Sequence, residues 1–148
     1  MKIPKRYIPR NLSRRDATIQ KRNIIQTRKL YKKGIYINRP NLKTFHSKKS
    51  SHIEKAKKIY KVDSIDPNSK TLSSRTKCSN RSLKKIVNKG EGAYYSSGSR
   101  PNQTAKSWGI ARLASSITGG PASKIDFKII EEGCSKRGPA YKMALKTV

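Results

Sequence analysis

The chain is short of acidic residues. Its 148 residues contain eight Asp and Glu against 36 Lys and Arg, which gives a formal net charge of +28 at pH 7. The carboxylates are scattered and only two histidines are present, so no pair of residues suited to acid–base or nucleophilic catalysis is apparent. We therefore expect a protein that is not an enzyme.

Hydrophobic residues are also scarce. They make up 33% of the chain, whereas globular proteins contain about 45–50%. No segment approaches the ~20 apolar residues of a membrane-spanning helix, and the basic, polar start does not resemble a signal peptide. The composition predicts one domain at most, with a small core of marginal stability and an extended basic segment.

Cysteine and histidine are too few for a metal site. Zinc requires closely paired ligands, but His46 and His52 are six residues apart and the sequence has no Cys-x-x-Cys motif beside them. Cys78 and Cys134 are isolated in the sequence, and we expect them to be reduced thiols in a reducing compartment. No metal and no cofactor is predicted.

What the chain has in excess is positive charge, and this charge is concentrated in the first 90 residues. Residues 1–90 hold 27 of the 36 basic side chains and four carboxylates, a net +23, while residues 91–148 carry a net +5. A compact unit with so much unpaired charge repels itself unless an anionic partner neutralises it. We therefore predict a basic arm with short helices over residues 1–90, ordered by its partners, and a small helical domain over residues 91–148.

The basic runs of the chain are the candidates for contact with a partner or with nucleic acid, because few acidic residues accompany them. These candidates are Arg14, Arg15, Lys21, Arg22, Arg28, Lys29, Lys32, Lys33, Lys48, Lys49, Lys55, Lys57, Lys58, Lys84, Lys85 and Arg100.

Hydrophobic spacing and capping residues predict a mainly α fold. Helices are expected over residues 14–33, 51–61, 81–89, 104–118, 122–132 and 140–146, and Gly90 is expected to end the third of them. The last three helices should form a small bundle anchored by Trp108. The side chains expected to line this core, or to dock a partner, are Tyr94, Tyr95, Trp108, Leu113 and Ile117.

The segment that contains Tyr94, Tyr95 and Arg100 has two interpretations. The two aromatic rings beside an arginine could stack on bases or hold a phosphate. Alternatively, the rings cover the small core and Arg100 pairs with Glu131 or Glu132. We favour the second interpretation, because a marginal core needs every aromatic side chain available to it.

Several longer strings are distinctive. They are YIPRNLSRRD from Tyr7, RKLYKKG from Arg28, SKKSSHIEKAKKIY from Ser47, and above all GAYYSSGSRPNQT from Gly92 with the following SWGIARLAS. Over about residues 7–145, the chain resembles a family of small basic proteins from large nucleocytoplasmic DNA viruses that infect algae and amoebae. That family has no assigned function, so it supplies an origin and no catalytic or binding residues.

The resemblance implies a virion structural protein. The first expectation is a minor capsid protein under the capsid shell, which bridges capsomers or meets the inner membrane through its basic arm. Its partners would be the major and minor capsid proteins, an anionic membrane surface and, non-specifically, nucleic acid. It would be found in the virion and, during assembly, in the host cytoplasm or virus factory.

The close alternative is a protein that binds and condenses viral DNA for packaging. A third interpretation, an RNA binder like a ribosomal protein, fits the charge but not the resemblance.

Overall fold

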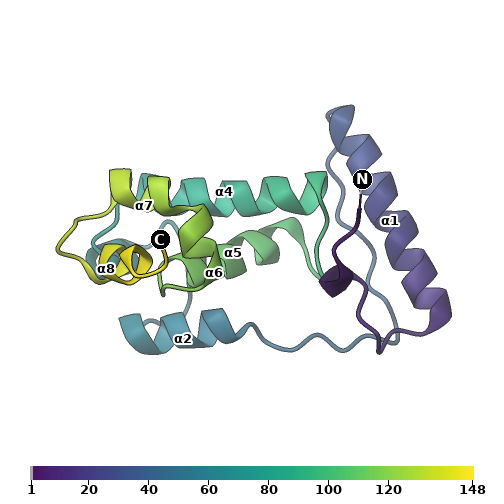
Figure 1. Ribbon diagram of the computed structural model, residues 1–148, viewed down its shortest axis with the longest axis horizontal. Helices are drawn as coiled ribbons and strands as arrows, with labels where there is room; N and C mark the ends of the chain where they lie inside the picture. The colour runs from purple at the N-terminus through teal and green to yellow at the C-terminus, as the bar shows by residue number, and fades with distance from the viewer. Residues whose placement is uncertain (1) are drawn as a thin grey trace. The chain divides into compact units, whose positions relative to one another are not determined.

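The computed structural model describes residues 2–148 and is mainly α, as the sequence predicts (Figure 1). A 3₁₀ turn, η1 (Lys5–Tyr7), precedes eight α-helices in the described chain. They are α1 (Arg14–Lys32), α2 (Ser51–Tyr60), α3 (Lys70–Thr76), α4 (Asn80–Ser96), α5 (Ala105–Ser116), α6 (Pro121–Ile125), α7 (Phe127–Gly133) and α8 (Pro139–Leu145). The described residues form no strand, and their β pairing is limited to an isolated bridge between Cys78 and Cys134.

Helix α1 begins and ends close to the predicted residues because its caps are encoded locally. The Ser13 side chain accepts a hydrogen bond from the Asp16 backbone N–H at 3.1 Å, which satisfies one of the free N–H groups of the first turn. At the other end Gly34 has a φ of +79°. The Ile35 and Gly34 N–H groups donate to the carbonyls of Leu30 and Tyr31, which is the Schellman arrangement of a helix end.

Gly90 does not end a helix, and the prediction of a helix over 81–89 was too short. Helix α4 continues through Gly90 to Ser96. A Cβ at Gly90 would lie 2.6 Å from the Cα of Gly109, so this glycine allows the backbones of α4 and α5 to approach closely. The sequence could not distinguish this packing role from a helix stop.

Two further differences concern short helices. The helix predicted over 122–132 is divided into α6 and α7 at Asp126, and α3 lies in a segment for which no helix was predicted. In α3 the Ser69 side chain accepts from the Leu72 N–H, and Leu72 is fully buried. A helix with so few apolar residues has no periodic pattern to detect.

The chain forms two compact units rather than an arm followed by a domain. Unit 1 comprises the segments Met1–Lys48 and Glu91–Trp108, and unit 2 comprises Lys49–Gly90 and Gly109–Val148. Both α4 and α5 contribute to both units. The predicted division at residue 90 therefore coincides with one unit boundary only, because long-range packing groups segments that are distant in the sequence.

Unit 2 contains the larger apolar core. Helices α6, α7 and α8 pack against one another (Figure 1), and Leu113 and Ile117 are fully buried, as predicted. The core also includes residues of the supposed arm. The buried members of this core are Ala56, Tyr60, Ile65, Leu72, Cys78, Leu83, Ile86, Val87, Leu113, Ala114, Ile117, Ile130, Cys134, Ala140 and Ala144.

Unit 2 also buries one carboxylate. Asp126 is fully buried, and its two oxygens accept from Arg112 Nε at 3.0 Å and Nη2 at 2.7 Å. Ser116 Oγ donates to it at 2.8 Å, and Lys89 Nζ lies 3.5 Å away. This shell offsets the cost of removing the charge from water, and it holds the junction of α6 and α7 against α5.

Unit 1 has its own small core, so residues 1–48 do not form the coreless arm that the sequence predicts. Its buried hydrophobic side chains are Tyr7, Ile24, Leu42, Tyr94 and Ala105. Trp108 was predicted to anchor the helical bundle, but it is half-buried and belongs to unit 1. Its ring contacts the Tyr7 ring edge to face, with the ring centroids 5.8 Å apart.

The expectation of two free thiols was wrong. Cys78 and Cys134 form a disulfide in unit 2, flanked by backbone hydrogen bonds from Ser79 N–H to Gly133 O and from Ser135 N–H to Lys77 O. The pairing joins residues 56 positions apart, and sequence spacing alone does not reveal such a partner. A disulfide is typical of an oxidising environment.

We predict that reducing this disulfide destabilises unit 2 by about 4 kcal/mol, because opening a loop of this length restores chain entropy to the unfolded state. Urea unfolding followed by far-UV circular dichroism, with and without reductant, measures the change. The double variant Cys78→Ser/Cys134→Ser should unfold like the reduced protein and should not respond to reductant. Two alkylatable thiols in the native, unreduced protein would contradict the assignment.

Candidate polyanion-binding surface

The exposed charge of unit 1 is almost entirely positive. The unit contains 17 Lys and Arg against two carboxylates, a net +15. One carboxylate, Asp16, is buried, and the other, Glu91, is half-buried. No fully exposed carboxylate therefore balances the cations in the described part of this unit.

Asp16 is occupied by structural contacts. Its carboxylate accepts from both the backbone N–H, at 3.0 Å, and the hydroxyl of Thr44. These two hydrogen bonds hold the pKa of Asp16 below its usual range, against the opposing effect of burial. The charge of Asp16 thus fixes the segment around Thr44 to the first turn of α1, where a helix N-terminus also favours an anion.

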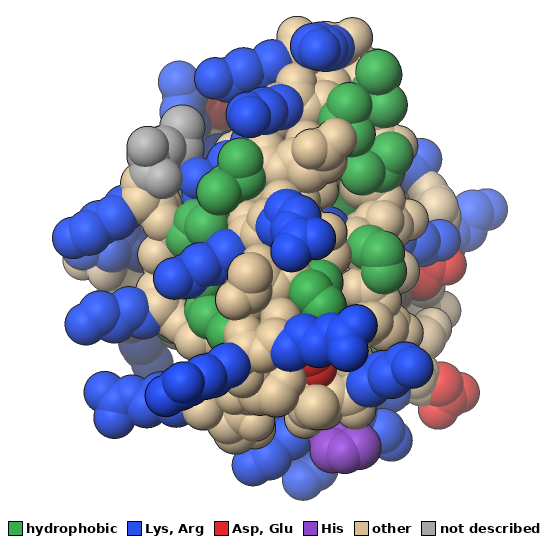
Figure 2. Space-filling view, turned by 90° about the vertical axis from the view of Figure 1, so that its right-hand side faces the viewer, with side chains coloured by type: hydrophobic (Ala, Val, Ile, Leu, Met, Phe, Trp, Pro, Cys, Tyr) green, Lys and Arg blue, Asp and Glu red, His purple; other side chains and the backbone are tan. Residues whose placement is uncertain are grey.

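Helix α1 places its cations on the side opposite its buried stripe. Asp16, Gln20, Ile24 and Thr27 are buried at helical spacing, so basic residues at the other positions project from the unit. On the face drawn in Figure 2, Lys and Arg side chains are spread widely, and acidic side chains are few.

The basic residues singled out from the sequence are exposed, except for Arg28 and Lys57, which are half-buried. Arg28 Nε donates to Ser97 O at 2.9 Å, and Lys57 lies 3.8 Å from Glu54. The candidates are divided between the two units. Those in unit 1 are Arg14, Arg15, Lys21, Arg22, Arg28, Lys29, Lys32, Lys33, Lys48 and Arg100, and those in unit 2 are Lys49, Lys55, Lys57, Lys58, Lys84 and Lys85.

A buried arginine that the sequence did not single out connects the segments of unit 1. Arg39 is only 7% exposed, and its guanidinium lies over the Tyr94 ring, with Cζ 3.8 Å from the ring centroid. Its Nη1 donates to Tyr94 O at 3.0 Å and its Nη2 to Ser99 Oγ at 2.8 Å. Burial lowers the pKa of Arg39, an effect that Tyr94 partly offsets, but an arginine remains protonated in proteins.

Tyr94 therefore has a structural role, as favoured above, and not an exposed base-stacking one. It is fully buried, and its hydroxyl accepts from the Arg39 N–H at 2.7 Å and donates to Gln103 O at 3.1 Å. The associated expectation for Arg100 was wrong. Its side chain is exposed, and the ion pairs of residues 2–148 include no Arg100–Glu131 or Arg100–Glu132 pair.

Two side-chain amides, those of Gln20 and Asn102, form hydrogen bonds to backbone groups of distant segments in the same unit. Gln20 Nε2 donates to the carbonyls of Tyr7 and Ser99, both at 3.2 Å. Asn102 accepts from Leu42 N–H at 2.6 Å and donates to Phe45 O at 2.8 Å. Together with Arg39, they bind the segments beside α1 to the connection between α4 and α5, which makes the cationic surface part of a folded unit.

A cluster of three tyrosine rings lies at the end of α1. The Tyr31 and Tyr95 rings are stacked, with planes 8° apart and centroids 6.1 Å apart. The Tyr36 ring lies 5.5 Å from Tyr31 and 5.2 Å from Tyr95. Burial, assisted by Glu91, raises the pKa of Tyr95, so the phenol remains neutral at neutral pH. Of these residues, only Tyr95 was singled out from the sequence.

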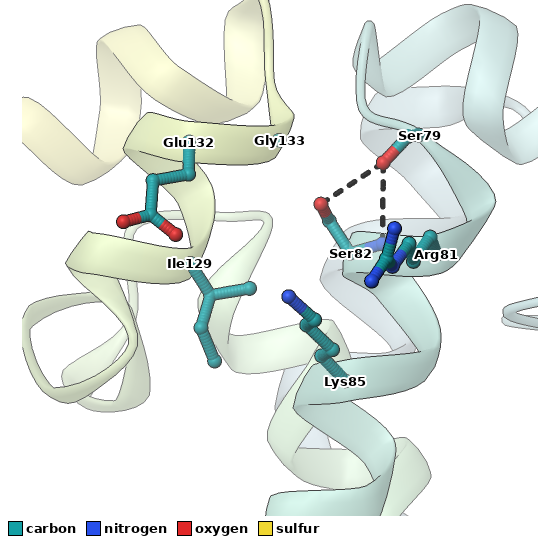
Figure 3. A pocket seen from close by; sticks show the side chains of 7 residues that line it. All are labelled: Ser79, Arg81, Ser82, Lys85, Ile129, Glu132 and Gly133. Atoms are coloured by element: carbon teal, nitrogen blue, oxygen red, sulfur yellow. Dashed lines mark hydrogen bonds between the residues drawn. The ribbon is translucent and has the colours of Figure 1, made fainter.

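Unit 2 has a separate hollow between the start of α4 and the end of α7 (Figure 3). Ser79 Oγ donates to Ser82 Oγ at 2.9 Å and accepts from Ser82 N–H at 3.2 Å, so both hydroxyls are engaged in the helix cap. Charges of both signs line the hollow. Its lining residues are Ser79, Arg81, Ser82, Lys85, Ile129, Glu132 and Gly133.

Over residues 2–148, no group of three or more His, Cys, Asp or Glu side chains is arranged to hold a metal ion. No helix in that range combines the length and hydrophobicity needed to cross a membrane.

We predict that Arg39→Met destabilises unit 1 by about 2–4 kcal/mol, because two buried acceptors lose their donor and the ring loses its cation. Trp108 belongs to unit 1, so its fluorescence during urea unfolding measures the change. Arg22→Met, on the exposed side of α1, removes the same charge and is the matched control. Equal stability of the two variants would show that Arg39 does not hold the unit together.

Comparison with known proteins supplies a family. A model of a family of unknown function, DUF5824, matches residues 4–128. No curated protein and no solved structure matches the chain. The match spans nearly all of unit 1 and much of unit 2, and we conclude that the chain belongs to the DUF5824 family.

Proposed function

We propose that this protein binds the phosphate backbone of nucleic acid without sequence preference, as a component that packages or condenses a viral genome. The observation that carries the proposal is the surface of unit 1, where a net charge of +15 has no fully exposed carboxylate to balance it. Clustered Lys and Arg on a folded surface displace the counterions of a polyanion, which makes binding strong and dependent on salt.

The folded state of unit 1 favours this function over the minor capsid function that was the first expectation. That expectation relied on an extended basic arm ordered by capsid proteins. Here the helix that carries the charge is held by its own hydrogen-bonded contacts to Ser99 and Thr44. A rigid cationic surface suits a polyanion of regular charge spacing, because no ordering entropy must be offset on binding.

The minor capsid function remains a second candidate for a specific reason. Unit 2 exposes the apolar side chains of Ile125, Leu145 and Val148, at 66%, 48% and 60%. Covering such residues with a protein surface is favourable in free energy.

The viral setting of both candidates comes from the sequence resemblance. The Cys78–Cys134 disulfide supports the proposal that the protein functions in an oxidising environment, such as that of a released particle.

The test is the salt dependence of binding to a 20-base-pair duplex of random sequence, followed by fluorescence anisotropy. Neutralising three exposed cations of α1, with Arg15→Gln/Arg22→Gln/Lys29→Gln, should reduce the slope of log affinity against log salt by roughly 2 to 3. At 0.1 M salt the affinity should fall about a hundredfold.

The matched control removes three exposed cations from unit 2, with Lys55→Gln/Lys84→Gln/Lys85→Gln. This variant has the same net charge and should lose much less affinity. Equal losses in the two variants would mean that net charge alone attracts DNA, and the assignment of the α1 surface would fail. Retention of the chain with the capsid shell, when graded salt removes the genome from opened particles, would favour the second candidate.

A further inference from the structure

The segment that follows Gly34, beyond the end of α1, exposes large apolar side chains to water. Ile35, Tyr36 and Ile37 are consecutive, and they are 47%, 62% and 36% exposed. In a chain with only 33% hydrophobic residues, three adjacent large side chains left in water indicate a surface that something covers.

The exposed segment is held in place from both ends. On one side, the Schellman bonds at Gly34 set the direction in which the chain leaves α1. On the other side, Asn38 Oδ1 accepts from the Ala105 N–H at 3.0 Å, and Arg39 is bonded to Tyr94 and Ser99. The apolar side chains are thus presented by an ordered backbone, which reduces the entropy lost when a ligand binds them.

The charges around the segment identify the class of ligand. Lys29, Lys32 and Lys33 are exposed in the last turn of α1 and just beyond it. Of the two carboxylates of unit 1, Asp16 is bonded to Thr44. The other, Glu91, interacts electrostatically with Tyr95 and contributes to raising its pKa. Hydrophobic side chains gather near the top of Figure 2 among lysines and arginines, where the end of α1 lies in Figure 1.

Aromatic rings surrounded by cationic side chains are typical of sites that bind single-stranded nucleic acid. The rings stack on bases while the cations follow the phosphates. A paired duplex does not offer base faces for stacking, because they are already stacked within the helix. Tyr36 is the most exposed of the three tyrosines, and the Tyr31 and Tyr95 rings contact its ring at angles of 49° and 43° between the planes.

We propose that the cluster of Tyr31, Tyr36 and Tyr95 is a stacking platform for unpaired bases, so that the protein binds single-stranded nucleic acid in addition to duplex. This inference rests on the proposed function, and it adds a second mode of contact to the phosphate contacts of α1. Tyr36 supplies the contacting ring and Lys32 and Lys33 the adjacent phosphate contacts.

The test compares two variants of Tyr36 on two ligands, a 15-nucleotide oligo(dT) and a duplex of random sequence, by fluorescence anisotropy. Tyr36→Leu keeps an apolar side chain but removes the aromatic face, and Tyr36→Trp keeps the face. We expect Tyr36→Leu to weaken oligo(dT) binding roughly tenfold, to leave duplex binding unchanged, and to leave the salt slope unchanged for both. Tyr36→Trp should bind oligo(dT) at least as tightly as the native protein.

A second measurement locates the contact. Oligo(dT) carrying a photoreactive 5-iodouracil should crosslink to Tyr36 on irradiation, and mass spectrometry identifies the peptide. Tyr36 is 62% exposed, so both variants should melt like the native protein by circular dichroism, which would exclude misfolding.

The outcomes separate this inference from the proposed function. Duplex binding that depends on the α1 cations, with oligo(dT) binding unaffected by Tyr36→Leu, overturns the platform and leaves the proposed function intact. Failure of the native protein to bind either ligand overturns both. Self-association in light scattering that Tyr36→Leu abolishes would assign the cluster to a protein interface and also overturn the platform.

Discussion

Among the described residues of unit 1, no carboxylate forms an ion pair with the buried Arg39 guanidinium. A ring face, a carbonyl and a hydroxyl take the place of an anion. Tyr94 in turn bonds the Arg39 backbone and Gln103 O through its hydroxyl, so the two residues join three segments of chain. A guanidinium suits this position because its planar fork can stack and donate at the same time. The cationic surface and the tyrosine cluster both depend on this contact.

The lack of an acidic partner for Arg39 affects the charge balance of unit 1. If an acidic residue neutralised Arg39, unit 1 would carry a smaller excess of positive charge. Instead the unit uses one of its two carboxylates, Asp16, to hold Thr44, and leaves its exposed cations without fully exposed acidic neighbours. Such a surface destabilises the folded unit by self-repulsion, and a bound polyanion relieves that repulsion. If nucleic acid binds this surface as we propose, it should therefore stabilise unit 1 more than unit 2.

The sequence predicted what is encoded locally. The ends of α1 follow from Ser13 and Gly34, and the exposure of the basic residues follows from their charge. The sequence did not predict contacts between distant residues. Arg39 lies outside every helix that the sequence predicts, and its partners Tyr94 and Ser99 are 55 and 60 residues away. The same reason applies to the Cys78–Cys134 pair. Tyr94 and Tyr95 were singled out together, but adjacent helical positions point in different directions, so one is buried and the other belongs to the surface cluster.

The central claim is that unit 1 folds by its own contacts and so presents a preformed cationic surface. Hydrogen exchange on the dilute, monomeric protein, without nucleic acid or any protein partner, tests this most directly. The account predicts protection of the α1 amides from Ala17 to Lys32, together with those of α4 around Tyr94, above the level of unstructured peptide. Exchange of α1 at the rate of an unstructured peptide, while unit 2 remains protected, would contradict it and would return residues 1–48 to the status of an arm ordered by partners.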